Sequence, residues 1–305
     1  MKKCTRCRGC SMNFLHYPVM NKEVLEIFQA TGKKTFVDCT VGGGGHSHHI
    51  LSVFPEASVI AIDQDSESLA LARKNLQSFG KRVSFHLGTF ISLFEDFDCR
   101  RLAVSGILVD PGISTVQLKN DQRGFSHTLD GPLDMRKNLN SSLTAAEIPN
   151  SFSEDKLADI FSSYGEVSNA KRLSKAIIEK RLFTPWRSTV QLRRLVEDLN
   201  HWRPRPGLGH PAAKVFQALR IFVNNELDGI GSWLAKIPLH LRSGSRVVFI
   251  TYHSLEDRLV KRAFQQLQRL QKVELLRPFP AFPSRAEVEE NLASRSAKLR
   301  ALEVA

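Results

Sequence analysis

The sequence predicts an α/β protein in which a doubly wound parallel sheet is interrupted by a helical insertion. Between residues 35 and 110, short β-rich runs alternate with helical periodicity, which is the pattern of βαβ units. From about residue 116 to 210 the helical spacing has no convincing strands, and strand character returns at 245–252. The expected division is a leader at 1–13, a discontinuous sheet domain at 14–115 and 211–305, and an inserted helical domain at 116–210.

The composition of the 305-residue chain is that of a globular protein, with 42% hydrophobic residues. Its formal net charge of +12 favours an anionic polymer or an acidic surface as partner, although many basic proteins use their charge only for solubility. No apolar run approaches the roughly 18 residues that span a bilayer. Polar residues after the cationic N-terminus argue against a signal peptide. We therefore expect a cytoplasmic protein without a membrane anchor.

The sheet elements follow from two periodicities. Runs rich in β-branched and aromatic residues, bounded by turn residues, predict strands, and apolar residues spaced three or four apart predict helices. The expected strands are 35–38, 59–62, 83–86, 105–109 and 245–252, with a last pair at 273–276 and 298–302. The expected helices of the sheet domain are 47–53, 66–79, 212–234 and 255–270.

Three apolar stripes predict helices in the insertion, and each stripe needs a partner helix to cover it. They consist of Leu157, Ile160, Phe161 and Tyr164, of Leu173, Ala176 and Ile177, and of Leu192, Leu195, Val196 and Leu199. A helical core accounts for these stripes without any ligand.

Four consecutive glycines lie between the first expected strand and its helix, in the segment Asp38-Cys-Thr-Val-Gly-Gly-Gly-Gly-His-Ser47. Glycine lets backbone N–H groups approach a ligand closely, and a helix N-terminus follows. A dinucleotide would require Gly-x-Gly-x-x-Gly, but in the frame beginning at Gly42 the last glycine is replaced by Ser47. An acidic strand end followed by a glycine turn also fits S-adenosylmethionine. Asp38 would then open the loop, with Gly42, Gly44 and Gly45 around the amino-acid end of the cofactor.

Two acidic residues follow the second expected strand. Asp63 ends the strand, where a carboxylate accepts hydrogen bonds from both ribose hydroxyls of either cofactor class. Asp65 is expected to be an N-terminal acid of the next helix, where the helix dipole favours a negative charge. Asp63 is therefore a cofactor-binding candidate that does not discriminate between the two cofactors.

The fourth expected strand ends in Asp110-Pro-Gly-Ile113, at the sheet edge where open α/β folds bind their ligands. The lone pair of an exocyclic cytosine amine is conjugated with the ring, so groups that accept its N–H protons must localise that lone pair. Asp110 is expected to accept one, and the Pro111 carbonyl the other. This pair resembles the Asp/Asn-Pro-Pro-aromatic motif of amino methyltransferases, without the second proline and the aromatic residue. Methyl transfer from a sulfonium is intrinsically favourable, so positioning supplies much of the catalysis.

A series of motifs runs through the chain in a fixed order. They are His16–Val19, Asp38–Ser47, Gly124–Ser126, Asp130–Arg136, Tyr164–Glu166, His210–Ala212, Phe216–Ile221, His253–Arg258 and Ser294–Arg300. With this series the chain resembles the RsmH (MraW) family, the bacterial 16S ribosomal RNA cytosine-N4 methyltransferases, over nearly everything after residue 13. It departs from the family at Pro111 and Val116, where leucine and proline are usual.

The resemblance implies a Rossmann-like class I S-adenosylmethionine-dependent methyltransferase fold with an inserted all-helical domain. It also implies methyl transfer to the N4 amine of a cytidine in the decoding (P-site) region of 16S ribosomal RNA in the small subunit. The cofactor contacts that it implies are Gly44, Gly45, His46, Asp63, Phe90, Asp110 and Gln117. The unusual Pro111 would alter the pocket for the target amine.

Basic residues are concentrated between residues 170 and 205, with ten Lys and Arg side chains against three acidic ones. Because Phe183, Trp186 and Trp202 are interleaved with them, the segment suits a surface that tracks phosphates and stacks bases. The alternative is a solvated helix face with two core tryptophans. The RNA contacts expected from the family motifs and from polarity are Arg136, Arg220, Asn224 and Arg258.

The segment from His253 to Asp257 contains a histidine, a serine and two acids within one strand-to-helix turn. No nucleophile elbow surrounds Ser254, so we reject a hydrolytic triad. We expect Ser254 to cap the helix that begins at Leu255, with Asp257 at its third position, and His253 to face the substrate pocket.

The five cysteines do not predict a metal site. Cys4, Cys7 and Cys10 are close in sequence, but a fourth ligand for zinc is not evident. Cys39 and Cys99 are expected to be buried small apolar residues.

Two other functions stay open at this level. One is a methyltransferase for another nucleic acid or for a protein, and the other is a catalytically silent RNA-binding assembly factor. Intact Gly44, Asp63 and Asp110 favour an enzyme, because a binder needs no complete cofactor site. The sequence does not decide between a monomer and a homodimer.

Overall fold

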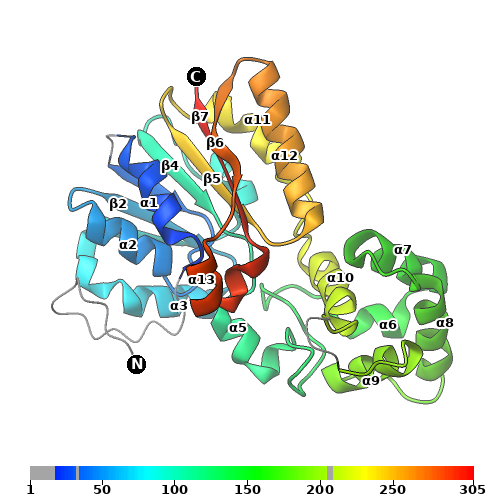
Figure 1. Cartoon of the computed structure of the whole chain (residues 1–305). Helices are drawn as coiled ribbons and strands as arrows, with labels where there is room; N and C mark the ends of the chain where they lie inside the picture. The colour runs from blue at the N-terminus through cyan, green and yellow to red at the C-terminus, as the bar shows by residue number, and fades with distance from the viewer. Residues whose placement is uncertain (1–17, 32–33, 205–208) are drawn as a thin grey trace.

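A computed structural model describes residues 18–31, 34–204 and 209–305. A seven-stranded sheet lies between two layers of helices, and a separate group of helices lies beside one end of the sheet (Figure 1). The strand order is β3-β2-β1-β4-β5-β7-β6. Strands β1 (Thr35–Asp38), β2 (Ser58–Asp63), β3 (Val83–Leu87), β4 (Val104–Val109) and β5 (Arg246–Thr251) are parallel, and β7 (Lys298–Val304) runs antiparallel to β5 and to β6 (Val273–Ala281). The expected Rossmann-like α/β sheet is confirmed.

Both faces of the sheet are buried, which explains why its central strands are continuously apolar. Successive residues of a strand point to opposite faces, so Phe36 and Val37 of β1 belong to different hydrophobic clusters. The cluster around Phe36 includes helices α1 (Asn21–Gln29), α2 (Gly45–Val53) and α3 (Ser66–Asn75). The cluster around Val37 includes α4 (Leu93–Asp96), α11 (Ile230–His240) and α12 (Ser254–Arg269). Cys39 and Cys99 are 2% and 1% exposed, as expected, whereas Cys4, Cys7 and Cys10 lie outside the described residues.

The helices beside the sheet share a third hydrophobic cluster. It joins α6 (Glu147–Ser151), α7 (Glu154–Gly165), α8 (Ala170–Arg181), α9 (Thr189–Leu199) and α10 (Ala212–Asn224). The three predicted apolar stripes all lie in or against this cluster. Helix α10 was expected with the sheet, yet Val215, Phe216 and Leu219 are buried among these helices. The division into domains stays a prediction, and this packing favours a boundary near residue 224 rather than 210.

Two expected helices end earlier than the sequence suggested. The single helix expected at 212–234 is two helices, because Asn225 adopts a left-handed φ of 48° after α10 and Gly229 one of 78° before α11. Asparagine and glycine tolerate this conformation, which ends a helix by turning the chain away from its axis. The helix expected at 66–79 ends at Asn75 and continues as the 3₁₀ segment η1 (Gln77–Arg82), in which Gly80 has a φ of 55°.

The remaining elements are short. They are η2 (Phe90–Ser92), α5 (Thr115–Lys119), η3 (Asp121–Arg123), α13 (Arg285–Glu290) and η4 (Leu292–Ser296). Within the described part of the chain, no helix has the length and apolar character needed to cross a membrane.

Gly106 on β4 lies where the sheet packs closely against α1. A Cβ atom at this position would lie 2.6 Å from Phe28 Cε1 and 2.8 Å from Phe36 Cδ1. We expect Gly106→Ala to lower the free energy of unfolding by about 1–3 kcal/mol, because the buried rings must shift. In the control Gly231→Ala, the added methyl meets no atom within 4 Å, so stability is unchanged or slightly raised. Urea unfolding measures both, and equal stability of the two variants would contradict the packing argument.

Candidate active site

Three aspartates lie at the carboxyl ends of neighbouring parallel strands. Asp38 ends β1, Asp63 ends β2 and Asp110 follows β4, and β1 lies between the other two strands. Because the carboxyl ends of parallel strands meet at one edge of the sheet, the fold brings together the three acids that the sequence predicted. The glycine loop begins at the same edge.

The glycine loop turns sharply between β1 and α2. Gly42 and Gly44 have φ values of 51° and 87°, in the left-handed region where a side chain is strained. A Cβ atom at Gly44 would also lie 3.1 Å from the buried side chain of Leu76. Helix α2 begins at Gly45 without a side-chain cap, so its first N–H groups remain available to a ligand.

Asp38 holds the two ends of this loop together. Its Oδ2 accepts a hydrogen bond of 2.7 Å from the Ser47 hydroxyl, and its Oδ1 accepts one of 3.3 Å from the Thr40 N–H. Burial raises the pKa of Asp38, which is 1% exposed. The structure therefore gives Asp38 a positioning role behind the loop, and its direct contact with a cofactor stays a prediction.

Asp63 fixes the start of the glycine turn. Its Oδ2 accepts a 2.8 Å hydrogen bond from the Gly42 N–H, and its Oδ1 accepts a 3.0 Å hydrogen bond from the Asp65 N–H. Burial raises the pKa of Asp63 to about 6, against the lowering effect of these two N–H groups. Each carboxylate oxygen accepts more than one hydrogen bond, so both retain capacity for a ligand hydroxyl.

Asp65 is the N-cap of α3, as expected, and accepts a 3.0 Å hydrogen bond from the Glu67 N–H. Gln117 donates its amide N–H to Asp65 and accepts a hydrogen bond from the Ser114 N–H. Arg123 pairs with Asp65 at 3.0 Å. Both ends of the Gln117 amide are thus engaged inside the protein, and its contact with a cofactor stays a prediction. The sequence analysis missed Arg123, because nothing local distinguishes it from a surface arginine.

Asp110 is held by groups from three other residues. Its Oδ1 accepts a 2.7 Å hydrogen bond from the Tyr252 hydroxyl, and its own N–H donates to the Thr40 hydroxyl at 2.7 Å. Its Oδ2 lies 3.5 Å from Nε2 of His46, which is 6% exposed. Burial and the charge of Asp110 raise the pKa of Tyr252 well above its usual value, so Tyr252 stays protonated and donates. Pro111 is buried next to Asp110.

Tyr252 was missed as a site residue. The sequence analysis placed it only as the last residue of the strand expected at 245–252, and β5 ends one residue earlier, at Thr251. A signal existed, since this strand was expected to end at the same sheet edge as the strand before Asp110. Phe90, expected to contact the cofactor, lies with its ring edge-on to Trp233 and Phe249, at centroid distances of 5.3 and 6.0 Å.

The start of α12 differs from the expected cap. His253, not Ser254, is the N-cap, because its Nδ1 accepts a 3.3 Å hydrogen bond from the Glu256 N–H. Ser254 is the first helical residue, and its hydroxyl donates to Glu166, the C-cap of α7, at 3.1 Å. Asp257 pairs with Arg300 and Lys298 of β7 at 2.8 and 3.1 Å, so it anchors the helix to the sheet rather than capping it.

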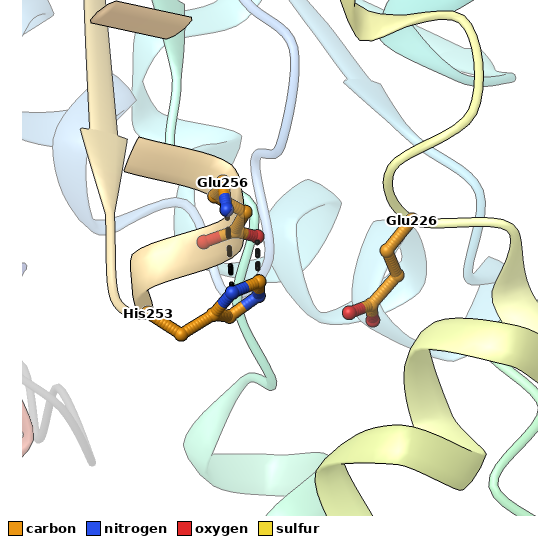
Figure 2. A group of neighbouring side chains, drawn as sticks. All are labelled: Glu226, His253 and Glu256. Atoms are coloured by element: carbon orange, nitrogen blue, oxygen red, sulfur yellow. Dashed lines mark hydrogen bonds and ion pairs between the residues drawn. The ribbon is translucent and has the colours of Figure 1, made fainter. Parts of the chain in front are cut away.

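His253 faces a small group of carboxylates (Figure 2). Its Nε2 lies 3.3 Å from Glu256 Oε1, and atoms of His253, Glu256 and Glu226 lie within 4.8 Å of one another. Glu226 is paired with Lys137 at 2.7 Å and with Arg220 at 2.8 Å. Burial alone would raise the pKa of Glu226, but these two cations outweigh it and hold the value at about 2. A divalent ion here would share Glu226 with two cations, so we assign the group to an internal ionic network.

The residues expected to contact RNA have partners within the protein. Arg136 pairs with Asp134 at 2.7 Å, and Arg220 pairs with Glu226. Asn224 accepts a hydrogen bond from the Lys137 N–H and donates to the Met135 carbonyl. Arg258 is half-exposed and lies 3.5 Å from Glu166. Their contact with RNA stays a prediction, and Arg258 is the most accessible of the four guanidinium and amide groups named here.

The basic segment between α8 and α9 has one exposed aromatic residue at its turn. Phe183 is 87% exposed and follows the exposed Leu182, whereas Trp186 is 2% exposed. The core interpretation is therefore correct for Trp186. Its ring centroid also lies 5.6 Å from Lys180 Nζ. Phe183 remains available for stacking.

Glu226 should contribute to stability in a pH-dependent manner. Its pKa of about 2 in the folded protein lies below the ordinary 4.5, so its stabilisation is present above pH 4.5 and is lost as pH falls toward 2. At pH 6 this amounts to about 3 kcal/mol. We expect Glu226→Gln to lower the free energy of unfolding strongly at pH 6 and about half as much at pH 3. Chemical denaturation at both pH values tests this.

The control for this measurement is Glu95→Gln. Glu95 pairs with Lys236 at 3.3 Å, but its side chain is 69% exposed, so water screens the pair. We expect little change in stability for this variant at either pH. An equally small effect for Glu226→Gln would show that the ionic network is not stabilising.

Comparison with known proteins identifies the family. The MraW methylase family matches residues 13–305. A protein of Cyanothece sp. named "Ribosomal RNA small subunit methyltransferase H" is 43% identical over 290 residues, 94% of each chain. A protein of the same name from Thermotoga neapolitana is 43% identical over 295 residues, 95% of this chain and 96% of that one.

Solved structures are more distant. A putative rRNA-methylase from Clostridium thermocellum covers 95% of this chain and all of its own length, with a TM-score of 0.45 and 10% sequence identity. That likeness adds nothing to the assignment, which depends on the sequence matches. Their extent and identity show that this chain belongs to the MraW methylase family.

Proposed function

We propose that the protein transfers a methyl group from S-adenosyl-L-methionine to the exocyclic N4 amine of a cytidine in the decoding region of 16S ribosomal RNA. Membership of a methylase family, and relatives named as small-subunit ribosomal RNA methyltransferases, support methylation of that RNA. The observation that carries the proposal is the convergence of the glycine loop, Asp63 and Asp110 at one sheet edge. An exocyclic amine as target suits the acceptor Asp110, and the N4 position of cytidine is what the resemblance to the RsmH family implies. Such a substrate places the protein in the cytoplasm.

The residues at this edge fit the cofactor. The left-handed glycines leave the backbone of the loop open, and α2 begins there with uncapped N–H groups. The buried Asp63 retains acceptor capacity. Neither ring nitrogen of His46 has a hydrogen-bond partner among the described residues, although the ring is almost fully buried. A buried polar group without a partner is unfavourable, so a bound molecule that supplies one would stabilise His46.

Each of these groups has a role in holding the cofactor. Asp63 accepts hydrogen bonds from the ribose hydroxyls, while Gly44, Gly45 and His46 lie around the amino-acid end. Phe90 is assigned to the adenine, and Gln117 is a further proposed contact of the cofactor. When bound, S-adenosylmethionine supplies an electrophilic methyl group on a positively charged sulfur. The protein needs only to orient the amine toward that methyl group.

Asp110 orients the target amine. One of its oxygens is occupied by the Tyr252 hydroxyl, which leaves Oδ2 to accept an N–H of the cytidine. The Pro111 carbonyl is the second acceptor. Hydrogen bonds from both N–H groups rotate the amine so that its lone pair is no longer shared fully with the ring. The Tyr252 hydroxyl fixes the carboxylate in place, because its raised pKa keeps the donor proton on the oxygen.

The decisive experiment is transfer of labelled methyl from S-adenosylmethionine to small ribosomal subunits, naked ribosomal RNA and DNA. We expect N4-methylcytidine in the RNA, found by nucleoside analysis. Asp110→Ala should lower kcat by about 10²–10⁴-fold, because the amine loses its acceptor. Asp159→Ala, at an exposed position on α7, serves as the control and should retain full activity.

Other outcomes would assign a different function. Label at a ring carbon or in protein would overturn the amine mechanism. A protein that does not bind S-adenosylmethionine at high micromolar concentration would instead be a silent RNA-binding factor. Full activity of Asp110→Ala would remove the proposed role of that carboxylate.

Binding of the cofactor should depend on pH through Asp63. The pKa of Asp63 in the free protein is about 6, and only its ionised form accepts hydrogen bonds at both oxygens. We expect the Kd for S-adenosylmethionine to rise about tenfold between pH 7.5 and pH 5, as Asp63 becomes protonated. Titration calorimetry at several pH values measures this.

Asp63→Asn separates this effect from titration of the cofactor itself. The variant should bind more weakly at pH 7.5 and should lose most of the pH dependence below pH 7. Asp121→Asn, at an exposed position, is the control and should titrate like the unmodified protein. A pH dependence that persists in Asp63→Asn would assign it to another group.

A further inference from the structure

A cavity of about 310 Å³ is lined in part by Tyr252, the residue whose hydroxyl donates to Asp110. Its walls come from the end of β5, the start of α12 and the segment from η4 into β7. The side chains used in the argument are those of Tyr252, His253, Phe282, Arg295 and Lys298, and we refer to this space as the Arg295 cavity. Its volume is at the lower end of the range of about 300–1,000 Å³ for sites that bind small molecules.

His253 lines this cavity, and its ring also lies beside Glu256 and Glu226. The His253 side chain is 9% exposed, and its Nε2 makes no hydrogen bond with any described residue. Its Nδ1 accepts a hydrogen bond from the Glu256 N–H, and its Nε2 lies 3.3 Å from Glu256 Oε1. His253 therefore forms a wall of the cavity, and the ligand contacts are argued from the other side chains.

The cavity is also positively charged. The Arg295 guanidinium has no ion pair or hydrogen bond with the described part of the chain. Lys298 lies 3.1 Å from Asp257, but Arg300 also neutralises that carboxylate at 2.8 Å. The 16-residue helix α12 begins at the cavity wall and adds the partial positive charge of its N-terminus. These groups favour an anion.

The remaining wall offers an aromatic surface. Phe282 is 62% exposed, although it follows directly on the buried Ala281 of β6. An exposed aromatic ring beside cations is the combination by which proteins hold single-stranded nucleic acids, with the base on the ring and the phosphate on the cations. A free phosphate would use the cations but not the ring, and would fill only a part of the volume.

We propose that the Arg295 cavity binds the nucleotide adjacent to the target cytidine, with its phosphate at Arg295 and Lys298 and its base against Phe282. The proposal depends on the proposed function, because it takes Asp110 as the place of the target amine. Tyr252 lines the cavity and donates its hydroxyl hydrogen bond to Asp110, so the two places share this residue.

The test compares Arg295→Ala with Arg285→Ala, using the full-length protein. Arg285 is a matched control on the neighbouring helix α13, since its side chain is 94% exposed and pairs only with Glu289 at 3.0 Å. The probes are a short single-stranded RNA that contains cytidine and intact small ribosomal subunits. Affinity is measured as a function of salt concentration, together with KM, kcat and the Kd for S-adenosylmethionine.

We expect Arg295→Ala to weaken RNA binding about tenfold and to reduce the slope of log K against log salt by about 0.7–0.9, as for one lost phosphate contact. KM for the subunits rises, while kcat and cofactor binding change less than twofold. Arg295→Lys keeps the charge and restores the slope. Phe282→Ala weakens RNA binding at least fivefold without changing the slope, because stacking releases no counterions.

Two results would overturn the proposal. One is an unchanged RNA affinity and salt slope in Arg295→Ala while the enzyme remains active. The other is that inorganic phosphate competes with the RNA probe for binding as effectively as RNA itself does. That result would make the cavity a simple anion site. Failure of the unmodified protein to bind S-adenosylmethionine or to methylate any RNA would instead reject the proposed function, so the two failures are distinguishable.

Discussion

Buried carboxylates at the ends of neighbouring parallel strands are the constraint on which the site depends. A charge removed from water is costly unless hydrogen bonds replace those that water made. Asp38 receives them from Ser47 and Thr40, and Asp63 from backbone N–H groups at the glycine loop. The acids and the loop therefore fix one another, because the turn that exposes backbone N–H groups to a ligand also directs one of them to Asp63.

The sequence predicted the sheet well because a doubly covered parallel sheet leaves a local trace, namely short continuous apolar runs. The breaks between elements were harder to predict. The residues of α10 and α11 continue one apolar periodicity, and the left-handed Asn225 lies next to Glu226, which is held by Lys137 from far along the chain. The cap of α12 was also misassigned. Serine is the more usual cap, but here the preceding histidine reaches the free N–H.

The difference between local sequence signals and contacts of distant residues also explains which site residues the sequence predicted and which it did not. The glycine loop, Asp63 and Asp110 were predictable because each follows a strand directly. Tyr252 contacts Asp110 from 142 residues away, and its role depends on β4 and β5 being neighbours. Arg123 likewise pairs with Asp65 across 58 residues. Single-residue predictions of RNA contacts were least informative, since polarity alone does not distinguish Arg136, which pairs internally, from Arg295, which has no ion pair within the described part of the chain.

The position of β7 determines the order in which the parts of the sheet can form. This strand follows the other six in sequence, yet it lies between β5 and β6, so neither has its full set of sheet partners until β7 has been synthesised. Strands β1 to β4, which carry the glycine loop and the three aspartates, pair only among themselves and with β5. On the ribosome, half of this enzyme would thus be built early, while the wall containing Arg295 and Lys298 forms last. A nascent chain would therefore form the loop proposed to bind the methyl donor before the cavity proposed to bind RNA.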